Sequence, residues 1–264
     1  MSVREESRRL SFEERADDYR HARPPYPVQV YELLAQRCGL GPGTRVLEIG
    51  AGTGQATRDL LARGAVVTAV EPGVRLAAHL AADLAPEVAS GQLRVVNDRI
   101  ETAPLSSTVD IVASATAFHW VRTDVTLPRL SGVLPEGGWL AVWWTVFGDP
   151  TRSTPFREDQ QALYERLLPT SARQQTRGPL NIESWRDELS QGGWFTRPEV
   201  EQIRWENPLT PDSVRRLFGS FTSVNELEPA RRAELLDGLA DLVRRHGGVV
   251  HDPHVTVVYL AQRR

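Results

Sequence analysis

A glycine-rich stretch, VLEIGAGTGQAT, is the first feature of the sequence that could do chemistry. It places glycines at alternate positions, Gly50, Gly52 and Gly54, directly after a short apolar run. Because glycine has no Cβ, such a loop lets the backbone approach a ligand closely. Glu48 lies two residues before Gly50, and Glu71 lies 21 residues after it, at the end of VTAVEP. An acid at that second place can accept hydrogen bonds from both hydroxyls of a ribose, so these residues predict a cofactor that contains adenosine.

The glycine spacing separates two such cofactors, a nicotinamide dinucleotide and S-adenosylmethionine. A dinucleotide fingerprint has glycine at its first, third and sixth positions, before a helix that receives a pyrophosphate. Counting from Gly50, the sixth position is Gln55. S-adenosylmethionine has no pyrophosphate, and a carboxylate such as Glu48 can bind its ammonium group directly or through water. The spacing favours S-adenosylmethionine, and with it methyl transfer over hydride transfer.

His119, in the segment AFHWV, is the candidate catalytic base. Methyl transfer is an in-line displacement in which alignment supplies most of the catalysis. An amine with a free lone pair needs little more, whereas a phenol or alcohol must lose a proton, and histidine with a pKa near ~6.5 is suited to accept it. The alternative is that His119 and Trp120 only form a wall of the cofactor site.

Aromatic residues suggest where the methyl acceptor would bind. Trp143, Trp144 and Phe147 lie at or just past the carboxyl end of a predicted strand, which is the ligand side of open α/β sheets. Since consecutive strand residues point to opposite faces, only one of Trp143 and Trp144 can face a site. Further aromatic residues follow at Trp185, Trp194 and Phe195. We expect an aromatic-lined pocket for a planar or apolar acceptor, although core packing explains most of these residues equally well.

Alternating strands and helices must position these residues. Patterns up to residue 147 predict helices at 28–38, 55–64 and 74–85, and strands at 45–50, 65–72, 92–97, 109–115 and 137–147. Short apolar runs separated by helices indicate βαβ units and a sheet covered on both faces. Beyond a polar segment, the sequence predicts a helix at 156–168, a strand at 199–207, two helices across 211–246 and a last strand at 255–262.

Composition excludes several kinds of chemistry. All 31 basic residues are arginine, so neither a lysine Schiff base to pyridoxal phosphate nor a P-loop lysine is available. The single cysteine, Cys38, excludes an intrachain disulfide and a multi-cysteine zinc site. His251 and His254, in HDPH, have no further ligand nearby in sequence. We therefore expect no metal, and a turn at HDPH before the last strand.

Charge and hydropathy limit the partners. The net charge is −3, and the arginine pairs are interspersed with acids, which disfavours a broad nucleic-acid surface. No apolar run approaches the ~20 residues of a membrane span, and the first residues carry no apolar signal segment. We expect a cytoplasmic protein with no membrane partner; oligomeric state is not readable from these patterns.

Four segments together, VLEIGAGTGQAT, VTAVEP, SATAFHWV and LPRLSGVLPEGGWLAVWW, resemble the class I S-adenosylmethionine-dependent methyltransferases. They are most similar to the small-molecule branch that includes trans-aconitate-type enzymes, and the likeness covers the chain except roughly 150–190. It implies a Rossmann-like α/β fold, with a mostly parallel seven-stranded sheet, helices on both faces and an antiparallel last strand. One domain would comprise an N-terminal helical lid (1–27), a cofactor-binding core (28–148), an inserted helical cap (149–196) and a C-terminal part of the core (197–264).

The resemblance also implies cofactor-binding residues at the carboxyl ends of the strands. These are Glu48, Gly50, Ala51, Gly52 and Gly54 in the first motif, Glu71 and Pro72 after the second strand, Arg99, Ile100 and Glu101 beside adenine, and Ala115 and Thr116 after the fourth strand. Arg99 departs from the family pattern, which commonly has aspartate there, so Asp98 or Glu101 is expected to contact the adenine amino group instead. Tyr19 and Arg23 resemble lid positions that reach the carboxypropyl tail; the alternative is an ordinary amphipathic helix.

The sequence therefore predicts an enzyme of secondary metabolism that moves a methyl group from S-adenosylmethionine to an oxygen or nitrogen of a small molecule and releases S-adenosylhomocysteine. His119, Trp120, Trp143, Trp144 and Phe147 are the candidate acceptor-pocket residues, and the cap should determine which acceptor binds. The alternatives are a protein that binds the cofactor without transferring methyl, an enzyme that uses it for another reaction, and a nicotinamide-dependent oxidoreductase.

Overall fold

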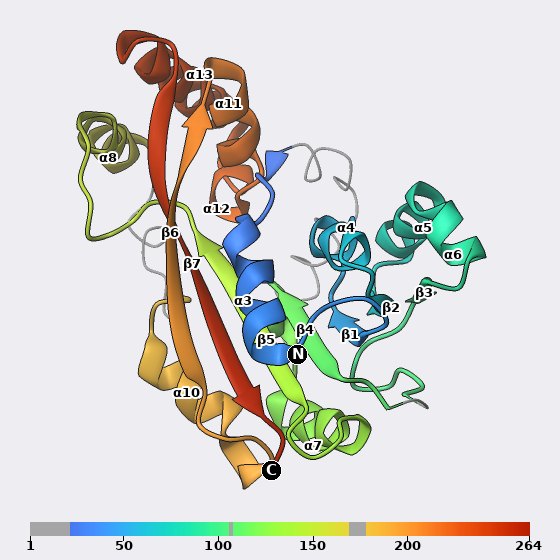
Figure 1. Cartoon of the computed structure of the whole chain (residues 1–264). Coiled ribbons are helices and arrows are strands. Elements are labelled where there is room, and N and C mark those ends of the chain that lie inside the picture. Colours follow the sequence, from blue (N-terminus) through green and yellow to red (C-terminus); the bar gives the residue numbers. More distant parts are fainter. Residues whose placement is uncertain (1–21, 106–107, 169–177) are drawn as a thin grey trace. The chain divides into compact units, whose positions relative to one another are not determined.

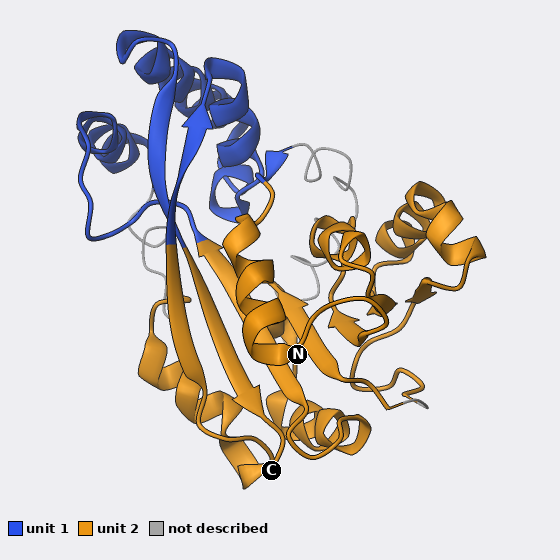
Figure 2. Ribbon diagram, viewed as in Figure 1, with its two compact units in different colours: residues 1–24, 146–178, 204–255 blue, residues 25–145, 179–203, 256–264 orange. Residues whose placement is uncertain are grey.

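A computed structural model describes residues 22–105, 108–168 and 178–264 (Figure 1). Residues 1–21, which include Tyr19 and most of the predicted lid, lie outside the described residues, as do residues 169–177 of the predicted cap. The chain divides into two compact units (Figure 2). The core unit comprises Pro25–Thr145, Pro179–Ile203 and Thr256–Arg264, and the helical unit comprises Met1–Pro24, Val146–Gly178 and Arg204–Val255. The predicted division into lid, core, cap and C-terminal part stays a prediction.

The sheet has seven strands in the order β3-β2-β1-β4-β5-β7-β6. They are β1 (Arg45–Ile49), β2 (Val66–Val70), β3 (Leu93–Val96), β4 (Ile111–Ala115), β5 (Trp139–Val146), β6 (Glu199–Leu209) and β7 (Val250–Gln262). β1 pairs in parallel with β2 and β4, β2 with β3, and β4 with β5. At the end of β7, the Arg263 N–H donates to the carbonyl of Gly138, just before β5 begins, at 2.8 Å. The mostly parallel sheet with an antiparallel last strand is confirmed.

Helices lie at each range where the sequence predicts one, and further helices lie between them. They are α3 (Val28–Cys38), α4 (Gln55–Ala62), α5 (Val74–Asp83), α6 (Ala85–Ala89), α7 (Thr123–Val133), α8 (Pro155–Leu167), α10 (Ile182–Leu189), α11 (Pro211–Gly219), α12 (Thr222–Asn225) and α13 (Pro229–Arg245), with 3₁₀ turns η1 (Phe118–Trp120) and η2 (Gln191–Gly193). The patterns did not predict α6, α7, α10 and α12. Local signals fix their ends. α3 stops at Gly39, whose φ of 74° is left-handed, and Thr210 begins α11 in a reciprocal capping box with Ser213.

In the core unit, helices cover both faces of the sheet. Val46 of β1 belongs to one buried apolar cluster and Leu47 to a second, because successive strand residues point to opposite faces. Residues of α3, α4 and α5 complete the first cluster, and residues of α7 and α10 complete the second. The side of the sheet that each helix covers is thus determined by the alternation within the strands.

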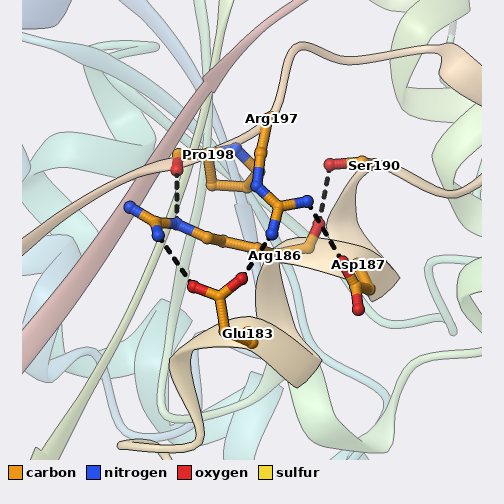
Figure 3. A network of polar contacts seen from close by, with 6 residues as sticks. All are labelled: Glu183, Arg186, Asp187, Ser190, Arg197 and Pro198. Carbon is orange, nitrogen blue, oxygen red and sulfur yellow. Dashed lines mark hydrogen bonds and ion pairs between the residues drawn. The ribbon is translucent and has the colours of Figure 1, made fainter.

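The helix α10 lies in the segment predicted as a cap, yet it contributes to the core. Trp185 and Leu189 are buried in the second cluster. Exposed ion pairs lie within the helix and between it and the segment before β6 (Figure 3): Glu183 accepts from Arg186 of the same helix at 2.9 Å and from Arg197 of that segment at 2.5 Å. Exposed pairs of this kind contribute ~0–1 kcal/mol each. Burial of the two apolar side chains therefore contributes most to holding α10 on the sheet.

The helical unit has its own core, formed by apolar residues of α8, α11, α12 and α13. Beside this core, the guanidinium of Arg157 donates to both carboxylate oxygens of Asp252, and His254 Nε2 lies 2.8 Å from Asp252 Oδ2. Asp252 and His254 both belong to β7, so the predicted turn at HDPH is wrong. These polar side chains can occupy a buried strand because they are paired with one another and with Arg157.

Candidate cofactor and acceptor site

The carboxyl ends of β1 and β2 meet at one edge of the sheet. The two strands pair in register as far as Ile49 and Val70, and the Gly50 N–H donates to the Val70 carbonyl at 2.8 Å. The Glu71 carboxylate accepts one backbone N–H at each oxygen, from Gly52 and from Gly73, both at 2.8 Å. Both oxygens of a carboxylate accept hydrogen bonds. The two glycine N–H groups also fix the carboxylate in orientation.

Two glycines of the loop serve different needs. Gly50 has a φ of 69°, and a Cβ there would lie 2.4 Å from Cβ of Ala117. This position requires glycine for both conformation and space. Gly52 has a φ of 56°, but a Cβ there would have no heavy atom within 4 Å. The backbone at Gly52 therefore borders open space, where a ligand can approach it.

Glu48 lies in β1, two residues before Gly50, and is buried. Thr57 Oγ1, on the first turn of α4, donates to Glu48 Oε2 at 2.6 Å. Burial raises the pKa of Glu48 to about 7, against the Thr57 hydrogen bond, which lowers it, and with a smaller increase from the charge of Glu71. Glu48 thus joins β1 to α4, and its contact with the cofactor ammonium stays a prediction. Sequence reasoning missed Thr57, whose hydroxyl faces β1 from the helix.

Residues after β3 hold the end of β2. Asn97 Nδ2 donates to the Glu71 carbonyl at 2.9 Å. Asp98 accepts from Thr102 Oγ1 and from the Arg99 N–H, both at 2.7 Å, and these two bonds lower the pKa of Asp98. Asp98 therefore stabilises the turn in which it lies, over residues 98–102. Sequence reasoning missed Asn97, although an amide just past a strand end is a signal for such a bond.

The predicted adenine contacts lie in the same turn. Ile100 is buried, and Glu101 accepts from the Arg122 N–H at 3.1 Å and lies 3.5 Å from the Arg99 guanidinium. Pro72 follows Glu71 directly and lies within reach of Asn97, whose Nδ2 donates to its carbonyl at 3.3 Å. The side chains of Asp98 and Glu101 thus both have protein partners, and which of them contacts adenine stays a prediction.

Thr116 follows β4 in a strained conformation. Its φ of 55° makes it the one non-glycine residue with a left-handed φ in the described part of the chain. The Thr116 N–H donates to the Trp143 carbonyl at 2.8 Å, and its Oγ1 lies 2.8 Å from the Tyr26 hydroxyl. Residues held in sparsely populated conformations concentrate at functional sites. Ala115, just before it, is half-buried at the end of β4.

His119 lies beyond this strained residue, on the turn η1. Trp144 Nε1 donates a hydrogen bond to His119 Nδ1 at 3.1 Å. Desolvation lowers the pKa of His119 from 6.5 to about 4. The residue as a whole is exposed to solvent, which opposes this desolvation. A pKa at or below 6.5 leaves the imidazole mostly neutral at pH 7.

The two tryptophans of β5 lie on opposite faces of the sheet. Trp143 is fully buried in the first cluster, edge-on to Tyr26 at 5.9 Å and Tyr31 at 6.3 Å between ring centroids. Trp144 is buried in the second cluster, on the side of His119. Trp120 is 39% exposed, with its ring 4.8 Å from that of His119. Of the two strand tryptophans, Trp144 is therefore the one that contacts a candidate site residue.

Comparison with known proteins bears on this arrangement. The family model for the methyltransferase domain matches residues 47–142. An uncharacterized methyltransferase of Mycobacterium tuberculosis is 29% identical over 254 residues, 94% of this chain and 93% of that protein. The trans-aconitate 2-methyltransferase of the same species is 35% identical over 116 residues, 42% of this chain and 41% of that enzyme. The structure of Haemonchus contortus phosphoethanolamine N-methyltransferase 2, in complex with phosphomonomethylethanolamine and S-adenosylhomocysteine, is similar with a TM-score of 0.53 and 19% identity, over 89% of this chain and 52% of that chain.

The chain is a methyltransferase, and its fold is that of the class I S-adenosylmethionine-dependent enzymes. The family recognised from the four sequence segments is thereby confirmed, and with it the enzyme class. The matched range begins in β1 and ends within β5, so it contains the carboxyl ends of β1, β2, β3 and β4. The likeness to the trans-aconitate enzyme covers less than half of the chain, and says nothing of the acceptor bound here.

Two further predicted site residues of this methyltransferase belong to the helical unit. The Arg23 guanidinium lies over the rings of Phe147 at 4.7 Å and Phe221 at 4.6 Å. Phe147 also lies edge-on to the ring of His254 at 5.2 Å. A cation between two aromatic faces is a stabilising arrangement in its own right. The predicted roles of Arg23 at the cofactor tail and of Phe147 at the acceptor stay predictions.

The described residues include neither a metal-binding cluster nor a membrane-spanning helix. In this part of the methyltransferase no three His, Cys, Asp or Glu side chains gather so that they could hold a metal ion. Nor does any helix within the described ranges have the length and apolar character needed to cross a membrane.

Proposed function

We propose that this methyltransferase transfers a methyl group from S-adenosylmethionine to an oxygen or nitrogen of a small-molecule acceptor, in secondary metabolism. The observation that carries the cofactor part is Glu71, whose carboxylate lies at the end of β2 and is oriented by two glycine N–H groups at 2.8 Å. A carboxylate with two accepting oxygens suits the two hydroxyls of a ribose. An acid at this place also binds the ribose of nicotinamide dinucleotides, so it is the glycine spacing, with Gln55 at the sixth position, that counts against a dinucleotide.

The residues present fit the cofactor in other respects. The open face of the loop at Gly52 would admit the amino acid tail, and Ile100 supplies an apolar side chain for adenine. When bound, S-adenosylmethionine supplies an electrophilic methyl group on its sulfonium. The protein then has to hold the acceptor in line with that methyl and keep water away, and such alignment can contribute up to ~7–11 kcal/mol in favourable systems.

The acceptor part rests on residues near His119. Trp120 leaves 39% of its surface exposed beside the histidine ring, and the net charge of −3 disfavours a nucleic-acid acceptor. An exposed tryptophan next to a polar ring suits a small acceptor with a flat or apolar part. His119, Trp120 and Trp144, three of the candidate pocket residues, belong to the core unit, which supports a single acceptor site that contains all three.

Calorimetry and a turnover screen test this proposal. The protein should bind S-adenosylhomocysteine and show no affinity for NAD. Incubation with S-adenosylmethionine and pooled phenols, amines and carboxylic acids should yield S-adenosylhomocysteine in at least one pool. Binding without turnover across all pools would favour the alternative of a cofactor-binding protein that does not methylate. Affinity for NAD alone would overturn the proposal.

A further inference from the structure

The contact between Trp144 and His119 restricts the chemistry that the histidine can perform. An indole N–H is a hydrogen-bond donor and never an acceptor. His119 Nδ1, which lies 3.1 Å from Trp144 Nε1, must therefore present its lone pair to the indole. In a neutral imidazole one nitrogen carries the proton and the other the lone pair. The proton of His119 consequently resides on Nε2.

Neighbouring side chains hold the Trp144 ring in place, so that it can determine the tautomer of His119. Its side chain is 3% exposed. The ring stacks against Trp185 with centroids 4.4 Å apart and meets the edge of Tyr259 at 5.8 Å. Tyr259 is itself fixed, because its hydroxyl donates to the Pro179 carbonyl at 2.6 Å. The indole cannot turn away without disturbing this cluster, and its N–H would then be buried without a partner, which is costly.

We infer that Trp144 is a positioning residue that holds His119 as the Nε2–H tautomer, so that His119 offers a hydrogen-bond donor to the methyl acceptor and does not act as its base. The inference rests on the proposed function for the identity of what the donor meets. The tautomer itself follows from the geometry alone. Protonation of Nδ1 would set two donors against each other, which also disfavours the imidazolium.

This tautomer determines which acceptors can react without further help. To act as a base through Nε2, His119 would have to move its proton to Nδ1 and lose the indole bond. The acceptor should therefore arrive with its nucleophilic lone pair already free, as an oxyanion or a neutral amine. That pair forms the bond to the methyl carbon while the carbon–sulfur bond breaks and its electrons go to sulfur. An oxyanion has no proton to release, and an amine releases its proton to solvent.

Nitrogen NMR of the histidine side chains tests the inference without knowledge of the acceptor. We would label the histidines of the full chain with ¹⁵N and assign His119 as the signal absent in His119→Asn. At pH 7.5 we expect a neutral ring with the proton on Nε2. Trp144→Phe keeps a buried aromatic ring and removes the N–H, so the ratio of tautomers should change by about 2- to 13-fold, the value of one net hydrogen bond. Trp185→Phe, which leaves the Trp144 indole in place, should keep the wild-type ratio.

Three outcomes would overturn the inference. They are an Nδ1–H tautomer in the wild type, an imidazolium at pH 7.5, or an unchanged ratio in a folded Trp144→Phe protein. If Trp144→Phe fails to fold, the wild-type tautomer alone decides. S-adenosylhomocysteine is titrated into each sample in parallel: failure of the wild type to bind it would count against the proposed function, whereas binding together with the wrong tautomer would count against this inference only.

Discussion

The N–H of Gly52 donates a 2.8 Å hydrogen bond to the carboxylate of Glu71 and so joins the loop after β1 to the end of β2. The two residues that sequence reasoning selected as cofactor ligands are therefore bonded to each other. The bond directs the acid toward the loop. A carboxylate fixed in this way loses little conformational freedom when a ligand binds, which reduces the free-energy cost of association.

The buried carboxyl of Glu48 should make the stability depend on pH. Burial raises its folded-state pKa to about 7, whereas an unfolded glutamate has a pKa of ~4.3. Between these values the folded protein keeps a proton that the unfolded chain has lost. The stabilising contribution is thus complete below pH ~4.3 and is lost as the pH rises through about 7.

Glu48→Gln should remove this dependence and keep an oxygen to accept the Thr57 hydrogen bond. From pH 5 to pH 8, the free energy of unfolding in urea should fall in the wild type, by up to about 3 kcal/mol, relative to the variant. Glu32, exposed on α3, provides the control as Glu32→Gln. Parallel pH profiles for the wild type and Glu48→Gln would show that burial does not raise the pKa of Glu48.

Gly50→Ala should destabilise the fold by more than its backbone conformation explains. A left-handed φ costs an alanine about 1–2 kcal/mol, and a Cβ 2.4 Å from Ala117 adds overpacking of about 1–3 kcal/mol. Gly43→Ala is the matched control, since Gly43 has a φ of 80° and open space around the added Cβ. Thermal unfolding should therefore show the larger loss for Gly50→Ala. Equal losses would mean that the loop relaxes freely away from Ala117.

Asp252→Asn should cost the helical unit several kcal/mol. The carboxylate is fully buried and accepts from both Arg157 and His254, so its loss leaves a largely buried guanidinium without its counter-charge, at a cost of about 3–5 kcal/mol. Asp237→Asn breaks an exposed pair with Arg215 and should cost no more than about 1 kcal/mol. Denaturant unfolding of both variants measures the difference. Similar small losses would show that the Asp252 cluster is not a stabilising element.

Sequence reasoning located the site at the strand ends because parallel strands place their carboxyl ends at one edge of the sheet. Motifs far apart in the chain could therefore be predicted to lie close together. It also separated Trp143 from Trp144 by the alternation of a strand. It could not find the bond between Trp144 and His119, which depends on how a turn after β4 folds back toward β5. Nor could it place HDPH, because the partner that lets Asp252 enter a buried strand, Arg157, lies 95 residues away. Local patterns carry no information on such pairings.

The central claim is that Glu71 holds the ribose of S-adenosylmethionine, and titration calorimetry with S-adenosylhomocysteine tests it most directly. Asn97→Ala, which removes bonds to the main-chain carbonyls of Glu71 and Pro72 and leaves the Glu71 carboxylate in place, is the control for disturbance of the strand end. We expect measurable binding to the wild type, a loss of about 10- to 100-fold in affinity for Glu71→Ala, corresponding to one hydrogen bond to a charged group, and a smaller loss for Asn97→Ala. Equal affinity of the wild type and a folded Glu71→Ala protein would contradict it.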